Sequence, residues 1–98
     1  MKIAIVIGSV WATRKDERLS PCKLLVVHTV NLQTGSFDGP PLVAVDRIGA
    51  GTGERVLLVE GSGARGAVPG NPPVDATVIG IVDDTAMELF EKETIHDV

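Results

Sequence analysis

Five short runs rich in Val, Ile and Leu, separated by turn-forming segments, constrain the fold of this chain more than any other feature of its sequence. Gly, Pro, Asn, Asp and Ser recur between the runs, as in "NLQTGSFDGPP" and "GSGARGAVPGNPP". Because no helical apolar spacing interrupts the series, the pattern favours an antiparallel barrel or sandwich over alternating βαβ units. The predicted strands cover residues 2–12, 22–30, 42–46, 54–60 and 74–82. Five strands in a small all-β domain predict an OB-like five-stranded antiparallel barrel.

The predicted strands are apolar on both faces, as "IAIVI", "LLVV", "VLLV" and "VIGIV" illustrate. The outward face of an antiparallel sheet is ordinarily polar because it meets water. A small barrel fills its interior with one face of each strand, so the second apolar face needs another cover. In a chain of 98 residues, of which 44% are hydrophobic, the core is too small to hide all of these side chains. We therefore expect the outer faces to meet neighbouring copies in a homo-oligomer.

The segment 83–98 differs in charge from the rest of the chain. Residues 1–82 carry a net charge of +1, whereas residues 83–98 carry −5. An Asp-Asp pair opens the segment and is suited to cap a helix, and Thr85 with Glu88 has the spacing of a capping box. The sequence therefore predicts a barrel domain over 1–82 and a short acidic C-terminal helix or tail over 83–98.

Composition limits the compartment and the partners of the chain. The longest early apolar run, 3–7, is too short for a signal peptide or a membrane span, which predicts a cytosolic protein without membrane contact. The single cysteine, Cys22, excludes an intramolecular disulfide and a Cys-x-x-Cys metal site. Binding of single-stranded nucleic acid needs stacking aromatic residues and a cationic groove, but aromatic residues are only 3% of the chain and no basic patch is present. We therefore predict no nucleic-acid partner.

The glycine-rich stretch "DRIGAGTGERVLLVEGSGAR", residues 46–65, suggests either a phosphate loop or turns between strands. A Walker loop needs GxxxxGK[ST] before a helix, but here no Lys follows the glycines and a predicted strand comes next. The dinucleotide fingerprint fails for the same lack of a helix. We therefore predict that Gly49, Gly51 and Gly53 provide turn geometry with positive φ.

No catalytic or metal-binding set is recognisable in the sequence. Ser62 has Glu60 and Ala64 where a GxSxG nucleophile elbow requires glycines. His28 and His96 have no cysteine or second histidine near them that would complete a metal site. We predict that the chain is not an enzyme and holds neither a metal nor a cofactor. An OB-type module that binds nucleic acid or a small ligand stays open as an alternative, because OB barrels often bind such ligands.

Four blocks of the sequence carry a family resemblance: "GSVWATRKDERL", "KLLVV", "PLVAVDRIGAGTGERVLLVEGSGAR" and "PVDATVIGIVD". In order and spacing they resemble the bacterial microcompartment shell vertex family, of the EutN/CcmL type, over residues 2–83. The resemblance implies a structural, non-enzymatic homopentamer that closes the vertices of an icosahedral shell in the cytoplasm. It also implies hexameric and trimeric shell proteins as the partners of that pentamer.

The same resemblance suggests roles for particular residues. It makes "DRIGAGTGERV" a tight turn between strands and places "GSGAR" at the central opening of the pentamer. Gly61, Ser62 and Gly63 are the residues expected to face that opening, where five chains converge and small side chains are needed. Trp11 departs from the smaller aliphatic residue that is more usual in the family, and we expect its large ring to be buried or interfacial.

Overall fold

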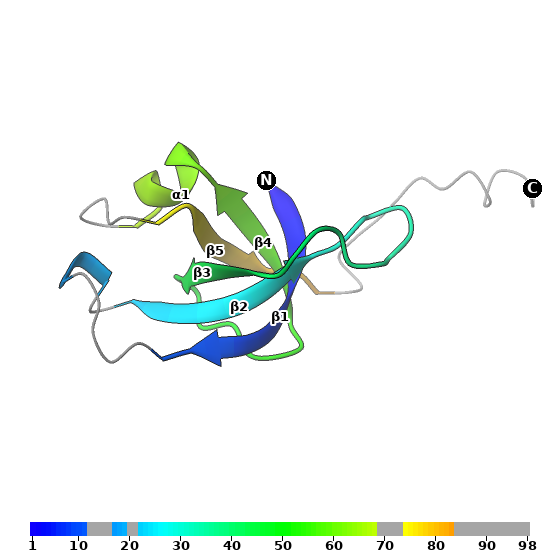
Figure 1. The fold of residues 1–98 in the computed structure, drawn as a ribbon, viewed down its shortest axis with the longest axis horizontal. Helices are drawn as coiled ribbons and strands as arrows, with labels where there is room; N and C mark the ends of the chain where they lie inside the picture. The colour runs from blue at the N-terminus through cyan, green and yellow to red at the C-terminus, as the bar shows by residue number, and fades with distance from the viewer. Residues whose placement is uncertain (12–16, 20–21, 69–73, 84–98) are drawn as a thin grey trace, which may run out of the picture.

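Five strands close into a barrel. The computed structural model describes residues 1–11, 17–19, 22–68 and 74–83 of the chain, without the side chains of residues 62 and 65. In chain order the elements are β1 (Lys2–Val10), a 3₁₀ helix (Glu17–Leu19), β2 (Lys23–Thr29), β3 (Leu42–Asp46), β4 (Arg55–Glu60), the short helix α1 (Ser62–Gly66) and β5 (Ala76–Ile81). Around the barrel the strands follow the order β1-β2-β3-β5-β4, and β4 pairs with β1 (Figure 1). The predicted five-stranded barrel is therefore confirmed, and the sandwich is excluded.

One pair of neighbouring strands is parallel, which corrects the prediction of an entirely antiparallel barrel. β3 and β5 pair in parallel through Val45 with Thr77 and Asp46 with Val78, whereas the other neighbouring strands are antiparallel. An odd number of strands cannot alternate in direction all the way around a closed sheet, so five strands require at least one parallel pair. The connection from β3 to β5 contains β4 and α1, which exceeds the dozen or so residues that a parallel connection needs.

Small and β-branched side chains fill the barrel interior. Side chains alternate between the two faces of a strand, and every second residue of these strands points inward. The core cluster consists of Ala4, Val6, Leu25, Val27, Ala44, Ala50, Val56, Leu58, Ala76 and Val78. Only Leu25 and Leu58 in this cluster are larger than valine, so the interior is narrow and is filled mostly by Ala and Val.

Part of the outer barrel surface is covered by the chain itself. The helix α1 packs against β4 and β5, and Ala64 in this helix is completely buried. Val45 and Thr77 are opposite each other on β3 and β5, and both are buried although their side chains do not belong to the barrel core. The apolar outer face predicted from the sequence is therefore covered from within the chain where α1 packs on β4 and β5.

The connection between β2 and β3 forms an arm, residues 30–41, which projects from the end of the barrel away from α1 (Figure 1). A β-bridge joins Val30 to Phe37 within the arm. His28 on β2 stacks on Phe37 with 4.1 Å between the ring centroids, and its Nε2 lies 2.7 Å from the carbonyl oxygen of Gly39. Because a carbonyl oxygen only accepts hydrogen bonds, Nε2 carries the proton. His28 therefore holds the arm against the barrel.

The predicted acidic helix or tail over 83–98 falls, apart from residue 83, on residues 84–98, which lie outside the described part of the chain, so the structure tests neither this segment nor the division of the chain before it. Both stay predictions. Among the elements in the described ranges, no helix is long and apolar enough to cross a membrane.

Candidate assembly surfaces and central-opening segment

The segment "GSGAR" forms a tight turn followed by the one-turn helix α1. Gly61 follows β4 directly and has a φ of 67°, a conformation that favours glycine. Its N–H donates to the carbonyl oxygen of Asp75, at an N···O distance of 2.8 Å, and its own carbonyl accepts from the N–H of Ala64 at 3.1 Å. This helix cannot be predicted from the sequence, because five residues with two glycines give no helical apolar spacing.

The three residues predicted to face a central opening lie together at the start of this segment. Gly61 and Gly63 are exposed, and Ser62 is the first residue of α1. A Cβ atom added to Gly63 would meet nothing within 4 Å. Small size at residue 63 is therefore not required by the packing of one chain on itself.

A buried hydrogen bond fastens α1 to the barrel. The hydroxyl of Thr77 donates to the carbonyl oxygen of Ala64 at 2.8 Å, and Thr77 is fully buried. The same carbonyl also accepts from the N–H of Ala67 at 3.3 Å. The position of the "GSGAR" segment thus depends on the Thr77 side chain of β5. In the sequence, the only signal of this contact is a polar threonine inside the otherwise apolar run of "DATVIGI".

Replacing Thr77 with valine is expected to lower the free energy of unfolding by about 1 kcal/mol, because a buried hydrogen bond is lost while the Ala64 carbonyl keeps a second donor. Hydrogen exchange at the amides of Ala64 and Ala67 should become faster, since α1 loses its tie to β5. Urea denaturation and amide exchange measure the two effects. Thr52→Val, at an exposed position, is the matched control and should change neither the free energy of unfolding nor the exchange rates. Unchanged amide exchange in Thr77→Val would mean that the Thr77 hydroxyl does not hold α1 on the barrel.

The glycines after β3 form a loop closely bound to the barrel. Gly49 and Gly53 have φ values of 90° and 89°, but Gly51 lies outside the positive-φ region, which corrects the prediction for that residue. Gly51 instead donates its N–H to Glu54 Oε1 at 2.6 Å, and an added Cβ would stand 3.3 Å from the same oxygen. Asp46 Oδ1 accepts from the N–H of residues 48 and 49, both at 2.9 Å. The missing side chain at Gly51 therefore lets the Glu54 carboxylate lie close against the backbone of this loop.

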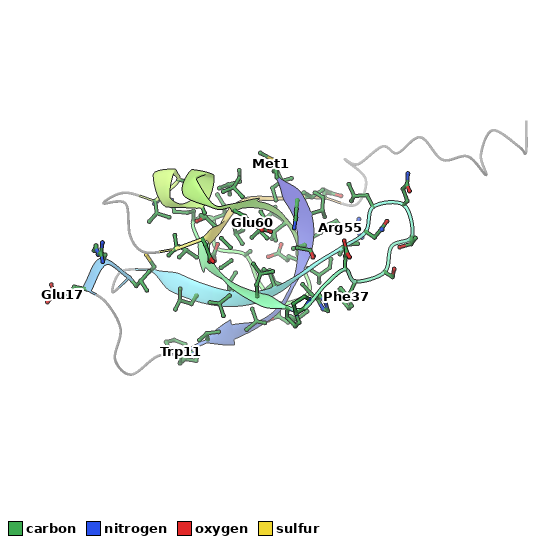
Figure 2. All side chains as sticks on the ribbon, turned by 45° about the horizontal axis from the view of Figure 1, so that its top comes forward. Met1, Trp11, Glu17, Phe37, Arg55 and Glu60 are labelled. Atoms are coloured by element: carbon green, nitrogen blue, oxygen red, sulfur yellow. The ribbon has the colours of Figure 1, made fainter. Side chains whose placement is uncertain are left out.

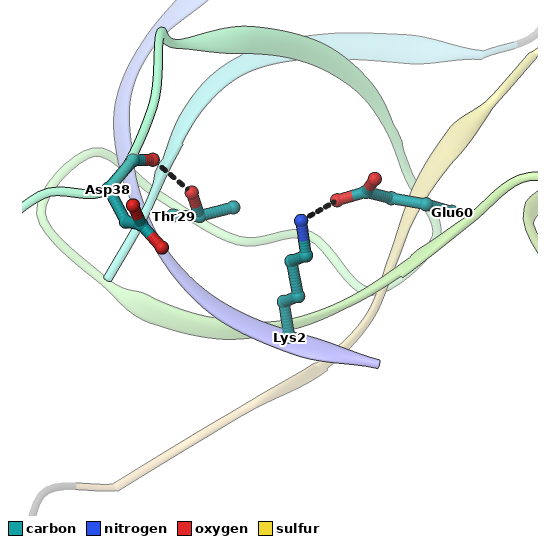
Figure 3. A network of polar contacts seen from close by, with 4 residues as sticks. All are labelled: Lys2, Thr29, Asp38 and Glu60. Atoms are coloured by element: carbon teal, nitrogen blue, oxygen red, sulfur yellow. Dashed lines mark hydrogen bonds and ion pairs between the residues drawn. The ribbon is translucent and has the colours of Figure 1, made fainter. Parts of the chain in front are cut away.

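A pocket of about 290 Å³ lies at one mouth of the barrel, between the arm and the ends of β1 and β4. Figure 3 shows Lys2 Nζ paired with Glu60 Oε1 at 3.4 Å, and the Thr29 hydroxyl donating to the backbone oxygen of Asp38. The side chains of Lys2 and Glu60 are 58% and 40% exposed, so their ion pair adds little stability. These contacts join β1 to β4 and the arm to β2. Among the described residues, no group of three or more His, Cys, Asp or Glu side chains is placed to hold a metal ion.

Trp11 extends from the end of β1 into solvent. Its side chain is 91% exposed, and Figure 2 shows it far from Phe37, the other labelled aromatic residue. The structure thus excludes burial of Trp11 within a single chain, which was one of the two alternatives for this residue. Within the described part of the chain, Trp11 and Phe37 are the exposed aromatic side chains, and they do not form a joint stacking platform of the kind that single-stranded nucleic acids use.

Comparison with known proteins identifies the family to which this chain belongs. A family model described as ethanolamine utilisation protein EutN/carboxysome matches residues 1–83. The chain belongs to the EutN/CcmL family. It is similar to the bacterial microcompartment shell vertex protein EutN of Salmonella typhimurium, with 51% identity over 85 residues, which cover 86% of this chain and 85% of that protein.

Two further members of the EutN/CcmL family extend the comparison. The carboxysome shell vertex protein CcmL of Thermosynechococcus vestitus is 39% identical over 98 residues, which cover 96% of this chain and 98% of that protein. The solved structure of the pentameric microcompartment shell protein GrpN from Rhodospirillum rubrum has a TM-score of 0.76 at 44% identity, covering 85% of this chain and 94% of that one. These relatives are named as shell proteins and not as enzymes. The alternative of an OB-type binding module is therefore not favoured.

Proposed function

We propose that this chain is a structural component of a bacterial microcompartment shell, and that five copies form a ring that closes a vertex of the shell. The observation that carries the proposal is the match to the EutN/CcmL family over residues 1–83, together with a barrel that superposes on a pentameric shell protein with a TM-score of 0.76. The apolar outer strand faces support it, because a closed ring covers such faces without leaving open edges.

The ring lies in the shell of a cytoplasmic compartment, its neighbours are hexameric and trimeric shell proteins, and the chain has no catalytic activity of its own. Gly61, Ser62 and Gly63 face the central opening of the ring. The exposure of Gly61 and Gly63 at the start of α1 supports this placement, because both residues are available to a neighbouring copy.

The proposal predicts the native mass of the protein. Tag-free protein should give a species of about 51.5 kDa, five times the 10.3 kDa of one chain, by native mass spectrometry or light scattering. The ring should persist over a tenfold range of concentration, since a closed ring satisfies every interface. A persistent 10.3 kDa species would overturn the proposal.

A further inference from the structure

One peptide of the arm, between Asp38 and Gly39, is held against β2 by its backbone. Asp38 donates its N–H to the carbonyl oxygen of Thr29 at 2.9 Å, and its own backbone oxygen accepts from the Thr29 hydroxyl. The carbonyl oxygen of Gly39 lies 2.7 Å from Nε2 of His28. Two adjacent residues of β2 thus fix this peptide on both of its sides.

The two reactive groups of the same peptide make no such contacts. Within the described ranges, neither the Asp38 carboxylate nor the N–H of Gly39 has a hydrogen-bond partner. In Figure 3 the dashed line from Thr29 ends at the backbone oxygen of Asp38 and not at its carboxylate. Both residues are exposed, and both line the pocket of about 290 Å³ at the mouth of the barrel. A carboxyl carbon and a peptide nitrogen are therefore adjacent, unengaged and open to water.

An aspartyl residue that precedes glycine can close a five-membered ring with the next peptide nitrogen. The nitrogen of Gly39 bonds to Cγ of Asp38, and one carboxyl oxygen leaves as water with the proton of the Gly39 N–H and the proton of the neutral carboxyl group. Glycine favours this step because it has no Cβ that would hinder the approach. The two groups belong to neighbouring residues, so their reaction needs no encounter between molecules.

The Thr29 hydroxyl is placed to assist this ring closure. The Gly39 nitrogen becomes a strong nucleophile when it loses its proton, and the negative charge of the deprotonated amide then spreads to the backbone oxygen of Asp38. That oxygen is the atom to which the Thr29 hydroxyl donates. Thr29 is only 7% exposed, so its hydroxyl is largely shielded from water. A donor that already points at the atom where charge develops stabilises the transition state.

We propose that the Asp38–Gly39 peptide is a modification site, at which a succinimide forms with the help of Thr29 and opens to isoaspartate. Water adds to one of the two carbonyl carbons of the succinimide. Cleavage of the bond between the nitrogen and Cγ restores aspartate, whereas cleavage of the bond between the nitrogen and the backbone carbonyl carbon leaves isoaspartate. The isoaspartyl link adds a methylene group to the backbone, which displaces Gly39 and breaks its contact with His28. The modification therefore releases this end of the arm.

Peptide mapping of aged protein tests the site. After prolonged incubation at neutral pH, the peptide that contains Asp38 should appear in two new forms. One is lighter by one water and is the succinimide; the other has an unchanged mass and is methylated by a protein isoaspartyl methyltransferase. Asp75 is the internal control, because it is also exposed but precedes Ala76, and it should stay aspartate. Asp38→Glu keeps the charge but would need a larger ring, and it should give neither form.

Variants of Thr29 test the assistance by its hydroxyl. Thr29→Val removes the donor and should lower the rate of Asp38 modification by about fivefold to tenfold. Thr29→Ser keeps a hydroxyl and should keep the rate. Circular dichroism establishes that the variants are folded, and Thr29→Ala, which removes the same donor, takes the place of Thr29→Val if the latter does not fold. If the hydrogen bond only immobilised the arm, its removal would raise the rate.

The outcomes separate this inference from the proposed function, because the modification takes place within one chain and does not need the ring. Absence of both modified forms from aged wild-type protein would overturn the inference. A rate that is unchanged or higher without the Thr29 hydroxyl would also overturn it. The vertex proposal would stand in either case, since it is tested by the native mass of fresh protein.

Discussion

Replacing Leu58 with alanine is expected to lower the free energy of unfolding by about 2–5 kcal/mol, toward the upper end of that range. Leu58 is fully buried on β4, opposite Lys2 of β1 and Val78 of β5, and it is one of two leucines in the barrel core. The neighbouring core side chains are mostly Ala and Val. Valine is stiff at χ1 and alanine has no rotamers, so neither can turn into the space that the leucine leaves.

Leu32→Ala is the control for this variant, because it makes the same chemical change at an exposed position of the arm. It should alter the free energy of unfolding by no more than about 0.5 kcal/mol. Both variants should be denatured with urea at one fixed protein concentration, since the unfolding of an assembled ring depends on concentration. A loss below about 1 kcal/mol for Leu58→Ala would mean that the core rearranges to fill the space.

The sequence predicts the five strands because each is a local apolar run bounded by turn residues. Even the ends of β3 at residues 42 and 46 were predicted correctly. The presence of a parallel pair could have followed from the strand count alone, since an odd closed barrel cannot be antiparallel throughout, but the count does not say that the pair is β3 with β5. What local patterns cannot provide is the order β1-β2-β3-β5-β4, because that order depends on which distant edges meet.

Features that depend on a single tertiary contact were not predicted. The helix α1 has too few residues for a helical pattern, and it is held by its packing on β4 and β5 and by the hydroxyl of Thr77. The repeated G-x-G-x-G spacing does not distinguish Gly51 from Gly49 and Gly53, and the contact of Gly51 with the Glu54 carboxylate is visible only in the structure. For the candidate opening, the family resemblance supplied the residues, and composition alone could not have done so.

Replacing Gly63 with tryptophan is expected to abolish the ring while leaving the single chain folded. In one chain a side chain at residue 63 meets open space, and the φ of Gly63 lies outside the positive region, so the free energy of unfolding of the single chain should change by no more than about 0.5 kcal/mol. If this residue faces the central opening, five indole rings must share the space around the axis. Native mass spectrometry should then show 10.3 kDa chains in place of the ring.

Gly63→Ala is the matched control, and it should keep the ring because one methyl group per chain adds little bulk at the axis. Gly61 would be a poor choice for the same test, since its φ of 67° would strain any other residue and would confuse a local backbone effect with crowding between subunits. A Gly63→Trp protein that still forms the full ring would place α1 away from the axis. That result would require a new assignment of the central opening and would leave the proposed ring itself standing.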